Sequence, residues 1–377
     1  MSSVVKFGRQ TVKSIGDTLH LLSASKVFLV TGNKSFSKSS KKIKFETFLS
    51  DFQYVRYHNF QINPQLDDVL KGIKLFKDFA PDVVVCVGGG SVLDMGKLVN
   101  ILGSQENENY EAIISNNLIS SKGLPLIAVP TTSGSGSEST HFAVVYVNGK
   151  KFSLTHPYIL PSHSIIDPEL CFDMPKYLAA CSGMDALCQA IESFWSVGGT
   201  IESRGYALKA IHIIRNSIIP AVSKKDKLAM VEMSKAANLA GKAINISKTT
   251  APHAISYAIT KRFGIPHGHA VALTLGKFFV INTKNDNIAV QKEDNSIGLH
   301  RRMQILFDCF DTSSAVECSR KWIMLMKSIG LETNFKKLGI VDEVDIKNVI
   351  ENVNLERLSN HPIQISNTIL REIFPKI

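Results

Sequence analysis

The sequence predicts an N-terminal α/β domain with a parallel sheet, followed by an all-helical domain. In the first half, apolar and β-branched runs alternate with helical patterns, which is typical of a parallel sheet covered on both faces. Glycine-rich turns follow two of these runs. Beyond about residue 175 the helical patterns continue with few strand signals, so we expect domains at 1–175 and 176–377.

The elements of the first half follow from their patterns. A short β-branched run ends at Gly32 and Asn33, and a later run is apolar throughout, as in a buried strand. We expect, in order, a strand at 26–31, a helix at 65–79, a strand at 82–87, a helix at about 92–102 and a strand at 124–129.

Helical periodicity dominates the second half. It is clearest in residues 177–196, 201–216, 227–243 and 314–329. The turn at 264–268 is rich in Gly, Pro and His, which a simple helical bundle would not need. The tail beyond about residue 335 carries no motif that we can interpret.

Composition limits the class of protein. The chain has 377 residues, of which 44% are hydrophobic, so it can bury a sizeable core. No run of about 18 apolar residues indicates a membrane span, and the N-terminus lacks the pattern of a secretory signal. The six cysteines form no C-x-x-C pair, which favours buried thiols and a cytoplasmic protein.

The net charge of +10 is scattered along the chain. Its one dense cluster, residues 34–44, lacks the interleaved aromatic residues that stack on bases, so we expect no nucleic-acid partner. The cluster is either a solvated surface or a source of steering for an anionic ligand.

Two turns are candidates for binding a dinucleotide. Residues 88–91, Gly-Gly-Gly-Ser, lie between a buried strand and a helix, where backbone N–H groups can approach a phosphate. A second polar turn at 130–138, which contains Ser137, follows the next strand, and turns at neighbouring strand ends create a crevice. Because the G-x-G-x-x-G fingerprint is absent, the first turn could also be only a tight connection.

The end of the first predicted strand bears on the choice of cofactor. An acid there would bind the ribose hydroxyl of NAD, but the chain has Gly32 and Asn33 followed by a lysine. This favours NADP over NAD, although an ordinary Gly-Asn turn explains the residues equally well.

A metal site is the second candidate. Asp185 and Gln189 are four residues apart and share one face of a helix. Together with His253 and His267 they offer a carboxylate, an amide oxygen and two imidazoles, and such a site with an open position polarises a substrate oxygen. Each residue alone could instead be an ordinary surface or core residue.

Five motifs occur in an order and at a spacing that resemble a known family. They are GGGSVLDMGK (88–97), PTTSGSGSE (130–138), Ile166-Asp167-Pro168, GMDALCQAIE (183–192) and the pair His253 and His267. Together they resemble the iron-containing (group III) alcohol dehydrogenases, which are related to dehydroquinate synthase. The resemblance runs from about residue 20 to at least 280. It implies a dehydroquinate synthase-like fold, with a nucleotide-binding α/β domain and a helical metal-binding domain.

The resemblance also implies roles for single residues. The residues similar to the family's pyrophosphate contacts are Gly89, Gly90 and Ser91. Those similar to positions near the nicotinamide or its ribose are Asp94, Thr131, Thr132 and Lys151.

Asp185, His253 and His267 resemble three of the family's four ligands for Fe²⁺ or Zn²⁺. The fourth is usually a histidine, and this chain has Gln189, whose neutral amide is a poorer ligand. Another family histidine is replaced by Tyr257, whose phenol could relay a proton to the alkoxide.

The segment 245–273 resembles most closely the phosphonoacetaldehyde reductases, which make 2-hydroxyethylphosphonate in phosphonate biosynthesis. A dianionic phosphonate would suit the basic residues around the metal motif, which are Lys248, Lys261, Arg262 and His269.

The leading hypothesis is therefore a cytoplasmic, homodimeric aldehyde reductase that uses NADPH or NADH and a divalent metal. Asp185, His253, His267 and Tyr257 would be its catalytic residues. The alternatives are a general alcohol dehydrogenase, a cyclising lyase that uses NAD catalytically, and a binding module that has lost its chemistry.

Overall fold

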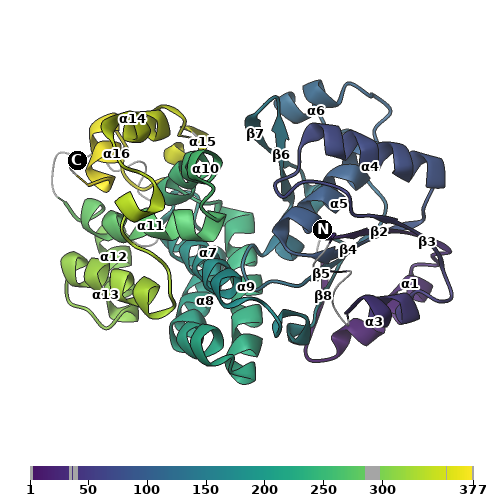
Figure 1. Ribbon diagram of the computed structural model, residues 1–377, viewed down its shortest axis with the longest axis horizontal. Coiled ribbons are helices and arrows are strands. Elements are labelled where there is room, and N and C mark those ends of the chain that lie inside the picture. Colours follow the sequence, from purple (N-terminus) through teal and green to yellow (C-terminus); the bar gives the residue numbers. More distant parts are fainter. Residues whose placement is uncertain (1–2, 34–35, 37–40, 285–297, 354, 376–377) are drawn as a thin grey trace. The chain divides into compact units, whose positions relative to one another are not determined.

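The computed structural model describes residues 3–33, 36, 41–284, 298–353 and 355–375. The chain divides into two compact units, Met1–Asp173 and Met174–Ile377 (Figure 1).

The first unit is built on a parallel sheet, as the sequence predicts, and the sheet has six strands. Its strands lie in the order β1-β8-β5-β4-β2-β3, and every neighbouring pair is parallel. Their bounds are β1 (Val4–Phe7), β2 (Lys26–Thr31), β3 (Gln53–Tyr57), β4 (Val83–Gly88), β5 (Leu126–Pro130) and β8 (His163–Ile166). The sequence patterns identified β2, β4 and β5, which are the central strands with the longest apolar runs.

Alternate residues of the central strands enter two separate cores. Phe28 and Val84 point into a core with α4 (Leu66–Phe79) and α5 (Gly90–Gly103). Their neighbours along the strands enter a second core with α1 (Ile15–Leu21) and α3 (Lys41–Phe48). Figure 1 shows these helix pairs over opposite faces of the sheet. The continuous apolar runs therefore reflect strands that are buried on both faces.

A two-stranded antiparallel hairpin joins the first core. It comprises β6 (Phe142–Val147) and β7 (Lys150–Thr155), and α6 (Tyr110–Asn116) packs near it. Its turn is Asn148-Gly149, in which both residues have positive φ, at 49° and 75°. An Asn-Gly pair between alternating strands is a strong hairpin signal that our sequence reading did not use.

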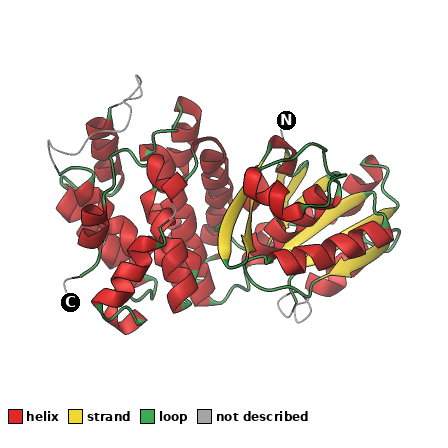
Figure 2. Cartoon of the chain, turned by 90° about the horizontal axis from the view of Figure 1, so that it is seen from above, coloured by secondary structure: helices red, strands yellow, loops and turns green. Residues whose placement is uncertain are grey.

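The second unit is helical throughout its described residues (Figure 2). The longer helices are α7 (Lys176–Trp195), α8 (Ile201–Ile219), α9 (Lys227–Ser247), α10 (Ala251–Phe263), α11 (His267–Ile281), α12 (Leu299–Cys309) and α13 (Ala315–Ser328). Three short helices follow, at α14 (Glu343–Glu351), α15 (Leu355–Ser359) and α16 (Asn367–Ile373). Within the described ranges, no helix is long and apolar enough to cross a membrane.

The turn at 264–268 separates two helices that carry candidate ligands. α10 ends at Gly264, whose φ of 68° suits a left-handed helix cap. Pro266 then precedes α11, which begins at His267. The residues of this turn thus stop one helix and start the next within three positions.

All six cysteines are buried thiols, as predicted.

Candidate metal centre and nucleotide-binding turns

Three predicted metal ligands meet in the second unit. Asp185 comes from α7, His253 from the start of α10 and His267 from the start of α11, and one ligand atom of each lies within 4.8 Å of the others. Asp185 Oδ1 is 3.4 Å from His253 Nε2 and 3.8 Å from His267 Nε2. Three residues that the sequence predicts as metal ligands therefore lie in one cluster.

A glycine allows α11 to reach α7. A Cβ atom on Gly268 would lie 2.1 Å from the backbone oxygen of Cys181 and 2.8 Å from Cβ of Asp185. Any side chain at this position would push the helices apart. Gly268 thus brings the adjacent His267 next to Asp185.

Buried partners orient both imidazoles. Glu192, on α7, is fully buried and hydrogen-bonds to Nδ1 of His253. It also accepts hydrogen bonds from N and Oγ1 of Thr250, at 2.7 and 2.8 Å. Nδ1 of His267 faces Oγ of Ser256 at 3.3 Å. With Nδ1 of each ring engaged, Nε2 is directed toward Asp185, as in the outer shell of metal-binding histidines.

The residues present fit a divalent cation. Oδ1 of Asp185 and Nε2 of His253 are buried and face each other at 3.4 Å, but neither has a well-aligned hydrogen bond among the described residues. Burial lowers the pKa of His253, but the carboxylates of Glu192 and Asp185 outweigh it and raise this pKa to about 9. A site that attracts a proton so strongly also attracts a metal ion, which would satisfy both orphaned atoms.

Gln189 and Tyr257 lie beside the cluster. Gln189 is buried one turn after Asp185. Burial raises the pKa of Asp185, but His253, His267 and a hydrogen bond from the Gln189 side chain together lower it. The amide therefore meets the carboxylate in this structure, and its role as a fourth ligand stays a prediction. The ring of Tyr257 stacks on the ring of His267, with centroids 5.4 Å apart and an interplanar angle of 6°.

The predicted substrate residues are not gathered at the cluster in the same way. His269 follows His267 by two residues on one helix, so the two point in nearly opposite directions. It is buried, its Nδ1 contacts the Tyr177 hydroxyl at 3.0 Å, and its Nε2 contacts the backbone oxygen of Glu332 at 2.7 Å. His269 is thus better described as a link within the helical unit than as a substrate ligand.

The two other predicted substrate residues lie at the end of α10. The guanidinium of Arg262 makes two hydrogen bonds to Oδ1 of Asp345, at 2.9 and 2.8 Å. Lys261 is exposed. Of the three residues, only Lys261 and the partly exposed Arg262 offer positive charge at the surface.

In the first unit, the two polar turns pack against each other. Gly88 at the end of β4 pairs with Pro130 at the end of β5, and Thr131 N donates to Gly88 O at 3.0 Å. A Cβ atom on Gly89 would lie 3.3 Å from Cγ2 of Thr132, and one on Gly90 would lie 2.9 Å from Oγ of Ser135. The glycines therefore permit this close contact at the carboxyl ends of two parallel strands, where dinucleotides bind in α/β sheets.

An arginine that our sequence reading missed marks the end of β2. Arg56, on β3, donates from Nε to Oγ1 of Thr31 at 2.7 Å and from Nη2 to Gly32 O at 3.0 Å. It thus adds a positive charge beside Gly32 and Asn33. The predicted basic cluster at 34–44 lies largely outside the described residues.

Two other predicted cofactor residues are engaged with each other. The Asp94 carboxylate accepts hydrogen bonds from Oγ of Ser137 at 2.7 Å and from N of Val144 at 3.1 Å. Burial raises the pKa of Asp94, and the nearby positive charges of Lys97 and of Lys151, on β7, oppose this rise. Ser91 is partly exposed at the start of α5, where its Oγ accepts a hydrogen bond from Asn63 N at 3.3 Å.

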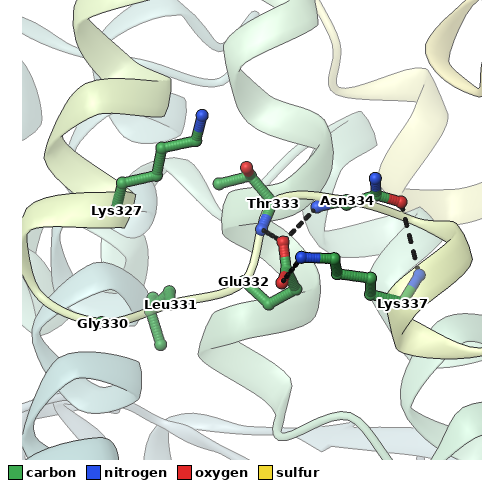
Figure 3. A pocket seen from close by; sticks show the side chains of 7 residues that line it. All are labelled: Lys327, Gly330, Leu331, Glu332, Thr333, Asn334 and Lys337. Atoms are coloured by element: carbon green, nitrogen blue, oxygen red, sulfur yellow. Dashed lines mark hydrogen bonds and ion pairs between the residues drawn. The ribbon is translucent and has the colours of Figure 1, made fainter.

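A surface pocket of about 650 Å³ is lined by the end of α13 and the segment that follows it (Figure 3). Its lining includes Lys327, Glu332 and Lys337 but none of the predicted catalytic, cofactor or metal residues. The Glu332 carboxylate accepts hydrogen bonds from the backbone N–H groups of Thr333 and Asn334, both at 2.8 Å, and faces Lys337. This pocket therefore has its acidic group already satisfied.

Comparison with known proteins covers both units. Residues 2–168 match the family described as iron-containing alcohol dehydrogenase, and residues 179–376 match the C-terminal family of Fe-containing alcohol dehydrogenases. The fold is similar to that of a sulfoacetaldehyde reductase from Bifidobacterium kashiwanohense in complex with NAD+. The TM-score is 0.87 at 28% identity, over 98% of this chain and 96% of that one.

The curated relatives align with a smaller share of this chain. Long-chain-alcohol dehydrogenase 1 of Geobacillus thermodenitrificans is 36% identical over 56% of this chain and 54% of its own length. Phosphonoacetaldehyde reductase of Streptomyces viridochromogenes is 32% identical over 57% of each chain. These alignments span little more than half of either relative. Our expectation that the chain resembles phosphonoacetaldehyde reductases most closely is therefore wrong, because such an enzyme is one of several distant homologues. The two family matches together span nearly the whole sequence, and the chain belongs to the iron-containing alcohol dehydrogenase family.

Proposed function

We propose that this protein is a metal-dependent aldehyde reductase that uses NADPH or NADH. The observation that carries the proposal is the cluster of Asp185, His253 and His267, whose ligand atoms lie within 4.8 Å of one another. Family membership supports an oxidoreductase that acts on CH–OH groups.

The residues of the cluster would hold Fe²⁺ or Zn²⁺. When bound, the metal supplies a Lewis acid for the aldehyde oxygen. Asp185 contributes the negative charge, and Glu192 and Ser256 keep the two imidazoles in the ring orientation that exposes Nε2. Tyr257, stacked on His267, would pass a proton to the alkoxide oxygen.

The turns at 88–91 and 131–137 would bind the dinucleotide. The nicotinamide supplies the hydride, while Gly89 and Gly90 let the backbone approach the pyrophosphate. NAD+ is bound in the sulfoacetaldehyde reductase structure, which supports a nicotinamide cofactor here. Arg56 at the end of β2 and the lack of an acid there favour NADPH.

Phosphonoacetaldehyde is the substrate that we propose, with 2-hydroxyethylphosphonate as its product. The similarity to a phosphonoacetaldehyde reductase and the exposed Lys248 and Lys261 support it. A general alcohol dehydrogenase is the second candidate, favoured by the higher identity to the long-chain alcohol dehydrogenase and by the engagement of His269 within the fold.

The test is the oxidation of NADPH and NADH at 340 nm by metal-loaded protein, with phosphonoacetaldehyde and with a simple aldehyde of similar size. Fast turnover of phosphonoacetaldehyde alone supports the proposed substrate, and equal rates on both aldehydes indicate a general alcohol dehydrogenase. No oxidation of either cofactor with either aldehyde would contradict the reductase.

A variant of Asp185 tests whether the reaction depends on a metal. We expect Asp185→Ala to abolish turnover and to lower bound metal to background, because it removes the anionic ligand, while the helical content by circular dichroism stays unchanged. Full activity in this variant and after EDTA treatment would contradict a metal-dependent reaction.

A further inference from the structure

The first unit contains a buried lysine that takes no part in the proposed reaction. Lys97 lies on α5 between apolar residues and is only 1% exposed. The helix lies directly on β4, because Gly96 leaves no side chain against Cys86: a Cβ atom there would be 2.0 Å from the Cys86 sulfur. A lysine in such a place needs a specific set of partners, since burying an unpaired charge is costly.

Its partners all lie between Ser137, the last residue of the proposed cofactor turn, and Phe142, the first residue of β6. The ammonium group donates to five oxygens at 2.5 to 3.1 Å, which are the backbone oxygens of Ser137, Thr140 and Phe142 and the hydroxyls of Ser137 and Thr140. Three N–H donors shared among five oxygens resemble the way in which a small cation is held by carbonyls and hydroxyls.

Asp94, one turn earlier on α5, holds the other side of the loop. Its carboxylate accepts from the same Ser137 hydroxyl and from Val144 N, so Ser137 is fixed between a carboxylate and an ammonium group. Residues 137–140 are all buried. The charged pair on α5 therefore sets the backbone path from the end of the 131–137 turn into β6.

We propose that Lys97 is a positioning residue, an internal cation that holds the 131–142 loop in the conformation that binds the dinucleotide. The functional part of this inference rests on the proposed function, in which the 131–137 turn contacts the cofactor. It also reassigns Asp94 and Ser137 from direct cofactor contacts to the support of that loop.

The charge on Lys97 is sensitive to alkaline pH. Burial lowers the pKa of Lys97 to about 8, against the carboxylates of Asp94 and Glu138 and the Cys86 thiol, which raise it. Above this pH the loop loses its cation, and cofactor affinity falls. The free energy of unfolding moves the other way, because a pKa depressed in the folded state makes folding more favourable as pH rises through it. A loss of affinity would thus not be a symptom of unfolding.

The experiment compares wild type, Lys97→Met and a control, Lys74→Met. Methionine has nearly the volume of lysine without its charge, and Lys74 is an exposed lysine on α4 paired with Asp78. We expect Lys97→Met to raise the dissociation constant of NADPH and NADH at least ten-fold, measured by nucleotide fluorescence at pH 7. Its metal content and the control's affinity should stay at wild-type values.

Two further readouts keep the inference testable. Hydrogen exchange of amides 131–142 should be faster in Lys97→Met, whether or not a nucleotide is added. The wild-type dissociation constant should rise between pH 7 and 9.5 with a midpoint near 8, and this dependence should vanish in Lys97→Met. Unchanged exchange and affinity in Lys97→Met, or a flat wild-type pH profile, would overturn the role of Lys97. Wild-type protein that binds no nicotinamide nucleotide would overturn the proposed function, and exchange would still decide whether Lys97 orders the loop.

Discussion

At the scale of single residues, the metal centre depends on partners that touch no metal. Glu192 is one of them: it fixes His253 through Nδ1 and also holds Thr250, the residue directly before α10. Its negative charge, with that of Asp185, would balance a divalent cation held in this buried site. If Gln189 is the fourth ligand, as predicted, this second carboxylate would offset the weak ligand character of its neutral amide.

We therefore expect Glu192→Gln to weaken metal binding about 10- to 100-fold, the usual effect of removing an outer-shell partner. Competition with a chelating dye measures the affinity. Glu202→Gln is the control, because Glu202 is exposed on α8 and bonds only to the Tyr206 hydroxyl among its described contacts. An affinity for Glu192→Gln equal to that of the control would show that Asp185, His253 and His267 bind metal unaided.

Residue type and spacing identified Asp185, His253 and His267 because ligands to metals form a small chemical set. Glu192 lies seven residues after Asp185, on the same helical face, so the sequence contained its signal. The engagement of His269 could not be predicted, because its partners Tyr177 and Glu332 are distant in the sequence and Glu332 contributes only a backbone oxygen.

At the scale of elements, close helix packing decides whether the ligands meet. We expect Gly268→Ala to lower the free energy of unfolding by about 1–3 kcal/mol, a typical cost of overpacking, and to weaken metal binding, because the new methyl group meets the backbone of α7. Chemical denaturation and the chelator assay measure the two effects. Gly205→Ala is the control: it lies within α8 with nothing within 4 Å of its Cβ position, so helix propensity should stabilise it by up to about 1 kcal/mol. Equal shifts in the two variants would refute the packing role.

The connection between α9 and α10 contains backbone strain. Lys248 has φ 60° and ψ −179°, a region open almost only to glycine. Asn360 keeps this connection in place by donating to the backbone oxygens of Ser247 and Thr249, at 2.8 and 2.9 Å. A strained residue held this firmly five positions before His253 is consistent with a functional side chain.

Lys248→Gly should raise the free energy of unfolding by about 1–3 kcal/mol, the cost of such a conformation. It should also lower kcat/KM for phosphonoacetaldehyde more than for an uncharged aldehyde. Lys225→Gly is the matched control, since Lys225 has the milder left-handed conformation of φ 52° and ψ 37° and should respond less. Equal losses on both aldehydes would argue against recognition of an anion by Lys248.

The strands that could be predicted from the sequence are those whose own residues form a clear apolar pattern. β2, β4 and β5 are apolar throughout because both faces of the sheet are covered. The edge strands gave weaker patterns: β3 is largely exposed along its first residues, and β1 has Val4 and Phe7 at 52% and 39% exposure. Their place in the sheet depends on pairing with β2 and β8, which a local pattern does not contain.

At the scale of the whole molecule, the two proposed ligands belong to different units. All three residues of the metal cluster lie in Met174–Ile377, and both glycine- and serine-rich turns lie in Met1–Asp173. The two family matches divide the chain in a similar way, at 2–168 and 179–376. Metal and nucleotide binding should therefore be separable by mutation.

This separation predicts where each ligand protects the chain. A metal present at 100 times its dissociation constant should stabilise the folded protein by about 2.7 kcal/mol. Hydrogen exchange after metal removal should therefore speed up in α7, α10 and α11, which the cluster joins, and stay unchanged in the β2, β4 and β5 strands. Asp185→Ala should abolish the metal effect and retain nucleotide binding, whereas Lys97→Met should retain the metal effect and weaken nucleotide binding. If either variant lost both metal binding and nucleotide binding, the units would not bind their ligands independently. The assignment of each ligand to one unit would then be wrong.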